Sequence, residues 1–110
     1  MINETMDKIE NKITNSVHIT DENKKEYLSM LGTLRSEVEE LSHTQKDQAE
    51  TISGFARVSA HEATREDINQ DLLDISIDGL RTSVQGFEAS NPKLVSIVNS
   101  VCSFLSNIGI

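Results

Sequence analysis

The chain has 110 residues, one cysteine and a formal net charge of −8 at pH 7. This length suits a single domain, and the acidic balance argues against nucleic acid and acidic lipid surfaces, because binding phosphates requires clustered lysine and arginine. Five glycines and one proline give few turn signals, so we expect long helices. With 4% aromatic residues the core must consist mostly of Ile, Leu and Val. The apolar fraction of 36% is low for a compact domain, so we expect a second copy of the chain to complete the core.

The first twelve residues carry charges throughout and contain no apolar run, so we expect no secretory signal and a cytoplasmic location. Cys102 cannot form an internal disulfide, since it is the only cysteine. Its apolar neighbours on a predicted helix indicate a small buried residue and not a reactive thiol.

A first helix is predicted over residues 3–16. Its apolar residues recur at helical spacing in a narrow stripe typical of a coiled-coil seam: Ile2, Met6, Ile9, Ile13 and Val17. A break follows at residues 18–21, where Thr20 or Asp21 is a candidate N-cap for the next helix.

A seven-residue apolar pattern then runs from Tyr27 to Ser59, with polar Gln45 and Gln48 in its middle. Two interpretations remain open. One is a single bent helix over residues 21–62. The other is two helices meeting near residues 42–44, with Ser42 and Gln45 as a capping box. In either case, Ile52, Phe55, Ala56 and Val58 are expected in the core.

Residues 63–69 form a polar linker, and Asp67 or Asn69 is a candidate start for the next helix. This helix is predicted to extend to about Ala89, with Gly79 and Gly86 inside it as points of close approach or bending. Its expected apolar positions are Ile68, Leu72, Leu73, Ile75, Ile77, Leu80, Val84 and Phe87. We thus expect one helical domain with N-terminal helices over residues 1–62 and a helical hairpin over residues 70–110.

The last helix is predicted to begin with Asn91 as N-cap and Pro92 at its first position. Gly109 and Ile110 fit a C-terminal cap against Leu105. Between Ala89 and Ile110 the only charged side chain is Lys93, and the helix is apolar over more than half its circumference, which favours burial on more than one side. We therefore predict a subunit interface at Leu94, Ile97, Val98, Val101, Phe104, Leu105 and Ile108. A partner protein's docking face and a membrane hairpin are the alternatives, and the many Ser and Asn residues argue against the hairpin.

Few residues suggest chemistry. His61 and Glu62 begin a zinc-protease pattern, but Arg65 occupies the position of the second histidine, so we expect a surface histidine paired with Glu62 or Glu66. Glu40 and His43 have the three-residue spacing of metal ligands in helical bundles, with Glu37 as a further carboxylate. Asp67, Asp71, Asp74 and Asp78 follow one helix face, where we expect solvation and Arg81 as the nearby counter-charge. No residue set predicts catalysis or a cofactor.

A resemblance to a known family rests on the segments FEASNPKL and SIDGLRTSV and on the Gly-Ile ending. Its main positions are Phe87, Glu88, Asn91, Pro92, Leu94, Gly109 and Ile110. They resemble a family of small bacterial all-helical proteins recorded only as a domain of unknown function. The resemblance implies a fold but no activity, and Asn91 stands where relatives tend to have histidine.

The prediction is an all-α bundle of four or five helices, hairpin-rich, with coiled-coil-like segments and a homo-oligomeric state, most simply a dimer. The predicted function is a non-enzymatic assembly or adaptor module that requires no cofactor. The alternative is a metal or small-ligand binding bundle that uses Glu37, Glu40 and His43.

Overall fold

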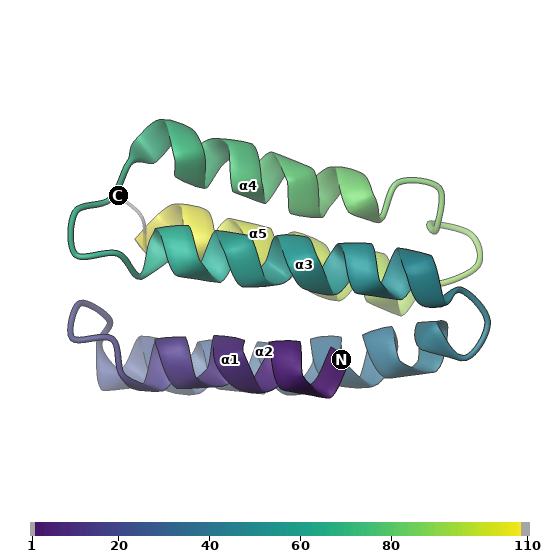
Figure 1. Cartoon of the computed structure of the whole chain (residues 1–110), viewed down its shortest axis with the longest axis horizontal. Helices are drawn as coiled ribbons and strands as arrows, with labels where there is room; N and C mark the ends of the chain where they lie inside the picture. The colour runs from purple at the N-terminus through teal and green to yellow at the C-terminus, as the bar shows by residue number, and fades with distance from the viewer. Residues whose placement is uncertain (1, 109–110) are drawn as a thin grey trace.

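Five α-helices and no strands make up the described part of the structure, a computed structural model that covers residues 2–108 (Figure 1). In chain order they are α1 (Ile2–Thr14), α2 (Asp21–Ser42), α3 (Lys46–Ala63), α4 (Gln70–Ser83) and α5 (Pro92–Ile108). The all-α prediction is confirmed. The open choice over residues 21–62 is decided in favour of two helices, because a turn at residues 43–45 separates α2 from α3.

The helices run roughly along the longest dimension of a body that measures 37 × 24 × 21 Å (Figure 1). In this view α1 and α2 form the lower layer, α3 and α5 form the middle layer, and α4 lies at the top. The α3 helix packs against all four other helices, and α5 packs against α2, α3 and α4. The core therefore surrounds α3, and α1 and α4 lie on opposite sides of it.

Small residues on α3 explain its central place. Its buried positions include Ala49, Ala56, Ala60, Ala63, Ser53 and Ser59. Short side chains allow neighbouring helices to approach closely, since interaxial distance depends on the residues at the contact. The buried hydroxyls of Ser53 and Ser59 donate to the carbonyls of Ala49 and Ala56, at 2.9 and 3.0 Å, so these polar groups are satisfied inside the helix.

Two predicted helix caps are confirmed and one is wrong. The Thr20 hydroxyl accepts a hydrogen bond from the Asn23 N–H at 3.1 Å, and the Asn69 side chain accepts one from the Leu72 N–H at 3.1 Å. Ser42 does not form the predicted capping box. Its hydroxyl instead donates to the Glu39 carbonyl at 2.6 Å and closes the end of α2.

The prediction that α4 continues to about Ala89 is wrong. The helix ends at Ser83, and Gly86 adopts a φ of 96°, a left-handed conformation that glycine reaches without steric cost. The Gly86 N–H donates to the Glu88 carboxylate at 2.7 Å, which closes the turn. Val84 and Phe87 are nevertheless buried. Their spacing correctly predicted burial, but the backbone there is a loop.

The hairpin of α4 and α5 is stabilised by packing along both helices. The α5 helix begins at Pro92, and the carbonyl of Asn91 accepts the Val95 N–H at 3.3 Å. The Asn91 side chain donates to the Ser90 hydroxyl at 3.2 Å. The predicted cap at Gly109 and Ile110 lies outside the described residues.

Candidate functional site

The predicted interface on α5 is mostly covered by the chain itself. Five of its residues are buried in the core: Leu94, Val98, Val101, Phe104 and Leu105. The Phe104 ring packs against the Tyr27 ring of α2 with centroids 5.4 Å apart. Only Ile97 and Ile108 are partly exposed, in a groove of about 820 Å³ between α5 and the start of α2. The wide apolar face of α5 is thus explained by its contacts with α2, α3 and α4.

The metal candidates are not brought together into a ligand cage. Glu40 and His43 are both exposed, and the His43 N–H serves as the C-terminal cap of α2 by donating to the Glu40 carbonyl at 3.3 Å. Across residues 2–108, no group of three or more His, Cys, Asp or Glu side chains is arranged to hold a metal ion.

The acidic residues of α4 remain exposed to solvent. Arg81 pairs with Asp78 at 3.3 Å, as the sequence indicated, and Asp74 accepts a hydrogen bond from Gln70 at 2.9 Å. The expected pairing of His61 with Glu62 or Glu66 is not found among the described residues, and the Glu62 carboxylate accepts a hydrogen bond from Arg65 at 3.0 Å.

Two buried ionisable groups lie inside the helical packing. Burial raises the pKa of the Tyr27 hydroxyl and of the Cys102 thiol above their ordinary values. The Tyr27 hydroxyl has no hydrogen-bond partner among the described residues. The thiol of Cys102 lies 3.8 Å from the Ile77 carbonyl. The predicted burial of Cys102 is therefore confirmed. A raised pKa and burial disfavour the reactive thiolate form.

Four large apolar side chains are exposed on α3 and α4, and two of them, Phe55 and Val58, were predicted to lie in the core. Phe55 is 38% exposed, Val58 45%, Leu72 45% and Ile75 65%. The two helices pack against each other, and the Phe55 ring lies over Gly79 of α4. Leu72, Ile75 and Gly79 share one face of α4 by helical spacing. These four exposed side chains form what we call the α3–α4 apolar surface.

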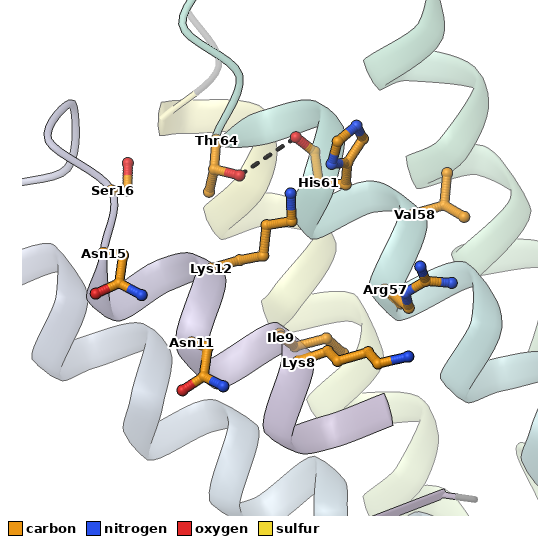
Figure 2. Close-up of a pocket in the computed structure, with 10 residues that line it drawn as sticks. All are labelled: Lys8, Ile9, Asn11, Lys12, Asn15, Ser16, Arg57, Val58, His61 and Thr64. Carbon is orange, nitrogen blue, oxygen red and sulfur yellow. Dashed lines mark hydrogen bonds between the residues drawn. The ribbon is translucent and has the colours of Figure 1, made fainter. Parts of the chain in front are cut away.

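A groove of about 670 Å³ lies between α1 and α3 (Figure 2). Its charged and titratable lining consists of Lys8 and Lys12 from α1 and Arg57 and His61 from α3. Polar side chains of Asn11, Asn15, Ser16 and Thr64 also line it, with Ile9 and Val58 as apolar contacts. We call it the α1–α3 groove.

The α1–α3 groove is positively charged in an acidic protein, and its lining contains no aspartate or glutamate. Figure 2 shows the Lys8 side chain extended toward Arg57 and the Lys12 side chain toward His61, from opposite walls. Within the described residues, Arg35, Arg65 and Arg81 form ion pairs, whereas Lys8, Lys12 and Arg57 form none. Like charges that line one groove repel each other, and a bound anion would reduce that repulsion.

Sequence reasoning missed the α1–α3 groove because the signal is divided between two distant segments. Lys8 and Lys12 are four residues apart on one helix, and so are Arg57 and His61 on another. Each pair is recognisable as one helix face. Only the packing of α1 against α3 places the two pairs opposite each other.

No helix in residues 2–108 combines the length and apolar character needed to cross a membrane. Comparison with curated proteins and with solved structures finds no match. A family model matches residues 27–110, which contain most of α2 and all of α3, α4 and α5. The chain therefore belongs to the family described as domain of unknown function (DUF4404).

Proposed function

We propose that this protein is a non-enzymatic assembly module that forms a homodimer through the α3–α4 apolar surface. The observation that carries the proposal is the exposure of Phe55, Val58, Leu72 and Ile75 on two helices that pack side by side. Grouped exposed apolar side chains mark contact sites on small proteins, whereas single ones are ordinary. Burial in a dimer would remove all four from water.

A second copy is the simplest occupant of this surface. In a two-fold dimer the same patch serves both partners, so that α3 of one copy can lie across α4 of the other. Each apolar side chain then meets apolar side chains, and no further partner is required. Alanine scanning of interfaces shows that a few large central side chains supply most of the binding free energy. Ile75 and Leu72 fit that role by exposure.

The distribution of reactive residues supports a non-enzymatic role. The three histidines are exposed on separate elements, His18 in the α1–α2 loop, His43 at the end of α2 and His61 on α3. The Cys102 thiol is buried and its pKa is raised by that burial. A cytoplasmic location stays a prediction for such a module, and a free thiol suits a reducing compartment.

The test is the mass in solution, measured by light scattering with size-exclusion chromatography at micromolar concentration. We expect a mass twice that of the 12.2 kDa chain, and a Leu72→Ser, Ile75→Ser double variant should elute as a monomer. Both side chains are exposed, so the substitutions leave the core intact. The matched control is Val17→Ser, since Val17 is 86% exposed in the α1–α2 loop, away from the proposed interface.

A monomeric wild-type protein would overturn the proposal. A dimer that persists in the double variant would move the interface elsewhere. The partly exposed residues of α5 are then the next candidates, and an Ile97→Ser, Ile108→Ser variant in the same assay measures whether the predicted α5 interface contributes.

A further inference from the structure

We propose that the α1–α3 groove is a binding site for a small organic polyanion that carries at least two phosphate or carboxylate groups. The charged residues of this site differ from those of the proposed dimer interface, because Lys8 and Lys12 lie on α1. Val58 of α3 is the one residue that the groove shares with the α3–α4 apolar surface.

The first argument is the unbalanced charge of the groove. The chain has 18 acidic and 10 basic residues, yet three of the ten basic side chains line one groove that has no acidic residue. Elsewhere in the described residues, arginines meet carboxylates. Arg35 bridges to Asp7 at 2.8 Å and to Glu10 at 3.7 Å. These two carboxylates of α1 therefore pair with α2, and Lys8 and Lys12 have no ion pair among the described residues.

The second argument is the geometry of the two walls. Lys8 and Lys12 extend from α1, and Arg57 and His61 face them from α3 (Figure 2). Lys8 points toward Arg57 and Lys12 points toward His61, so positive charge lies at two separate places in the groove. This arrangement matches a ligand with two separate anionic groups better than a single ion. Arginine offers a planar fork of donors that suits carboxylate and phosphate oxygens, and lysine adds a compact charge.

The third argument is size and polarity. A groove of about 670 Å³ falls within the range of small-molecule sites and exceeds what an inorganic ion requires. The 45% exposed side chain of Val58 supplies apolar contact, and the side chains of Asn11, Asn15 and Thr64 supply polar contacts. A long nucleic acid is disfavoured by the net charge of −8, because it would extend beyond the groove over acidic surface.

The experiment is isothermal titration of the full chain at low ionic strength with three probes: inorganic phosphate, tripolyphosphate and citrate. We expect saturable one-to-one binding of tripolyphosphate or citrate, weaker binding of phosphate, and loss of affinity on addition of NaCl. Tripolyphosphate and citrate separate a preference for phosphate from one for carboxylate.

The decisive comparison uses two charge-matched variants. A Lys8→Glu, Lys12→Glu variant should reduce affinity by at least about tenfold, because charge-assisted hydrogen bonds are lost and repulsion replaces them. A Lys25→Glu, Lys93→Glu variant changes the net charge by the same amount at exposed positions outside the groove and should retain nearly wild-type affinity.

Equal losses in the two variants would show attraction by overall charge and overturn the proposal. Absence of saturable binding by all three probes would also overturn it. Light scattering of the Lys8→Glu, Lys12→Glu variant supplies the remaining test. If this variant loses the dimer, the groove holds acidic residues of a second copy, and the small-polyanion proposal fails.

Discussion

The ring of Phe55 on α3 lies so close over Gly79 on α4 that a Cβ atom at residue 79 would collide with it. Glycine inside a helix usually destabilises it by about 1 kcal/mol relative to alanine. At this position the missing side chain leaves room for an aromatic ring from the neighbouring helix. The contact fixes the ring at the edge of the α3–α4 apolar surface, where it is 38% exposed.

The first prediction concerns coupling between these two residues. Gly79→Ala should fail to stabilise the wild-type protein, because displacing the Phe55 ring offsets the gain in helix propensity. Made in a Phe55→Ala background, the same change should raise the free energy of unfolding by about 1 kcal/mol. Urea denaturation of the wild type, the two single variants and the double variant gives the coupling free energy between residues 55 and 79. Repeating the four measurements in an Ile75→Ser background separates this coupling from any effect of dimer formation. Equal effects of Gly79→Ala in both backgrounds would contradict the contact.

The second prediction is that salt strengthens the dimer. Each copy has a net charge of −8, and Asp71, Asp74 and Asp78 are exposed on α4. Two such copies repel, and salt screens that repulsion while leaving apolar burial intact. The dissociation constant, measured by sedimentation over a series of NaCl concentrations, should fall as salt rises. Salt should instead weaken anion binding in the α1–α3 groove. If salt changed dimer affinity and anion affinity in the same direction, either the dimer interface or the anion site would be wrong.

The third prediction is that apolar packing holds α1 in place, with ion pairs in a minor role. Arg35 of α2 pairs with Asp7 and Glu10, both of which are more than half exposed. Exposed pairs stabilise weakly, so Arg35→Ala should lower the free energy of unfolding by at most about 1 kcal/mol. Ile9 is fully buried, and Ile9→Ala should lower it by about 2 to 5 kcal/mol. Chemical denaturation measures both, and the reverse order of the two losses would show that the ion pairs dominate.

The fourth prediction concerns the unpartnered hydroxyl of Tyr27, which is fully buried. Removing a buried donor that has no partner relieves its desolvation cost, so Tyr27→Phe should raise the free energy of unfolding by about 1 kcal/mol at neutral pH.

The Tyr27→Phe difference should grow at alkaline pH. Burial raises the pKa of Tyr27 above its ordinary 10.0, so the folded protein keeps a proton that the unfolded chain releases. The stability from that proton is fully present below pH 10 and is lost as pH rises further. Burial also raises the pKa of Cys102 above 9.0. The wild type and the Tyr27→Phe variant both contain Cys102, so its effect on stability does not contribute to the difference between them. Denaturation from pH 7 to pH 11 checks this, and a constant difference between the two proteins would contradict it.

Helical spacing predicted which segments are helices and where most of them start. Thr20 and Asn69 cap helices because their side chains satisfy free N–H groups, a local property that a sequence displays. The end of α4 was missed since Val84 and Phe87 keep helical spacing while their backbone turns at Gly86. Spacing reports which side chains are buried, and a loop can bury them as well.

The surfaces were less predictable than the helices. The wide apolar face of α5 predicted that it is buried on more than one side, but the sequence does not say whether the same chain or another chain buries it. In the structure, α2, α3 and α4 provide it. Conversely, Ile75 and Leu72 have the composition of core residues, and only the packing order of the helices leaves them exposed. The α1–α3 groove likewise depends on two helices that are not consecutive in the chain.

The contact of Tyr27 with Phe104 joins the second helix to the last one. During translation α2 is made before α5, so the apolar side chains of α2 that contact α5 stay exposed until α5 has been made. We therefore expect chains that lack α5 to be bound by chaperones or degraded.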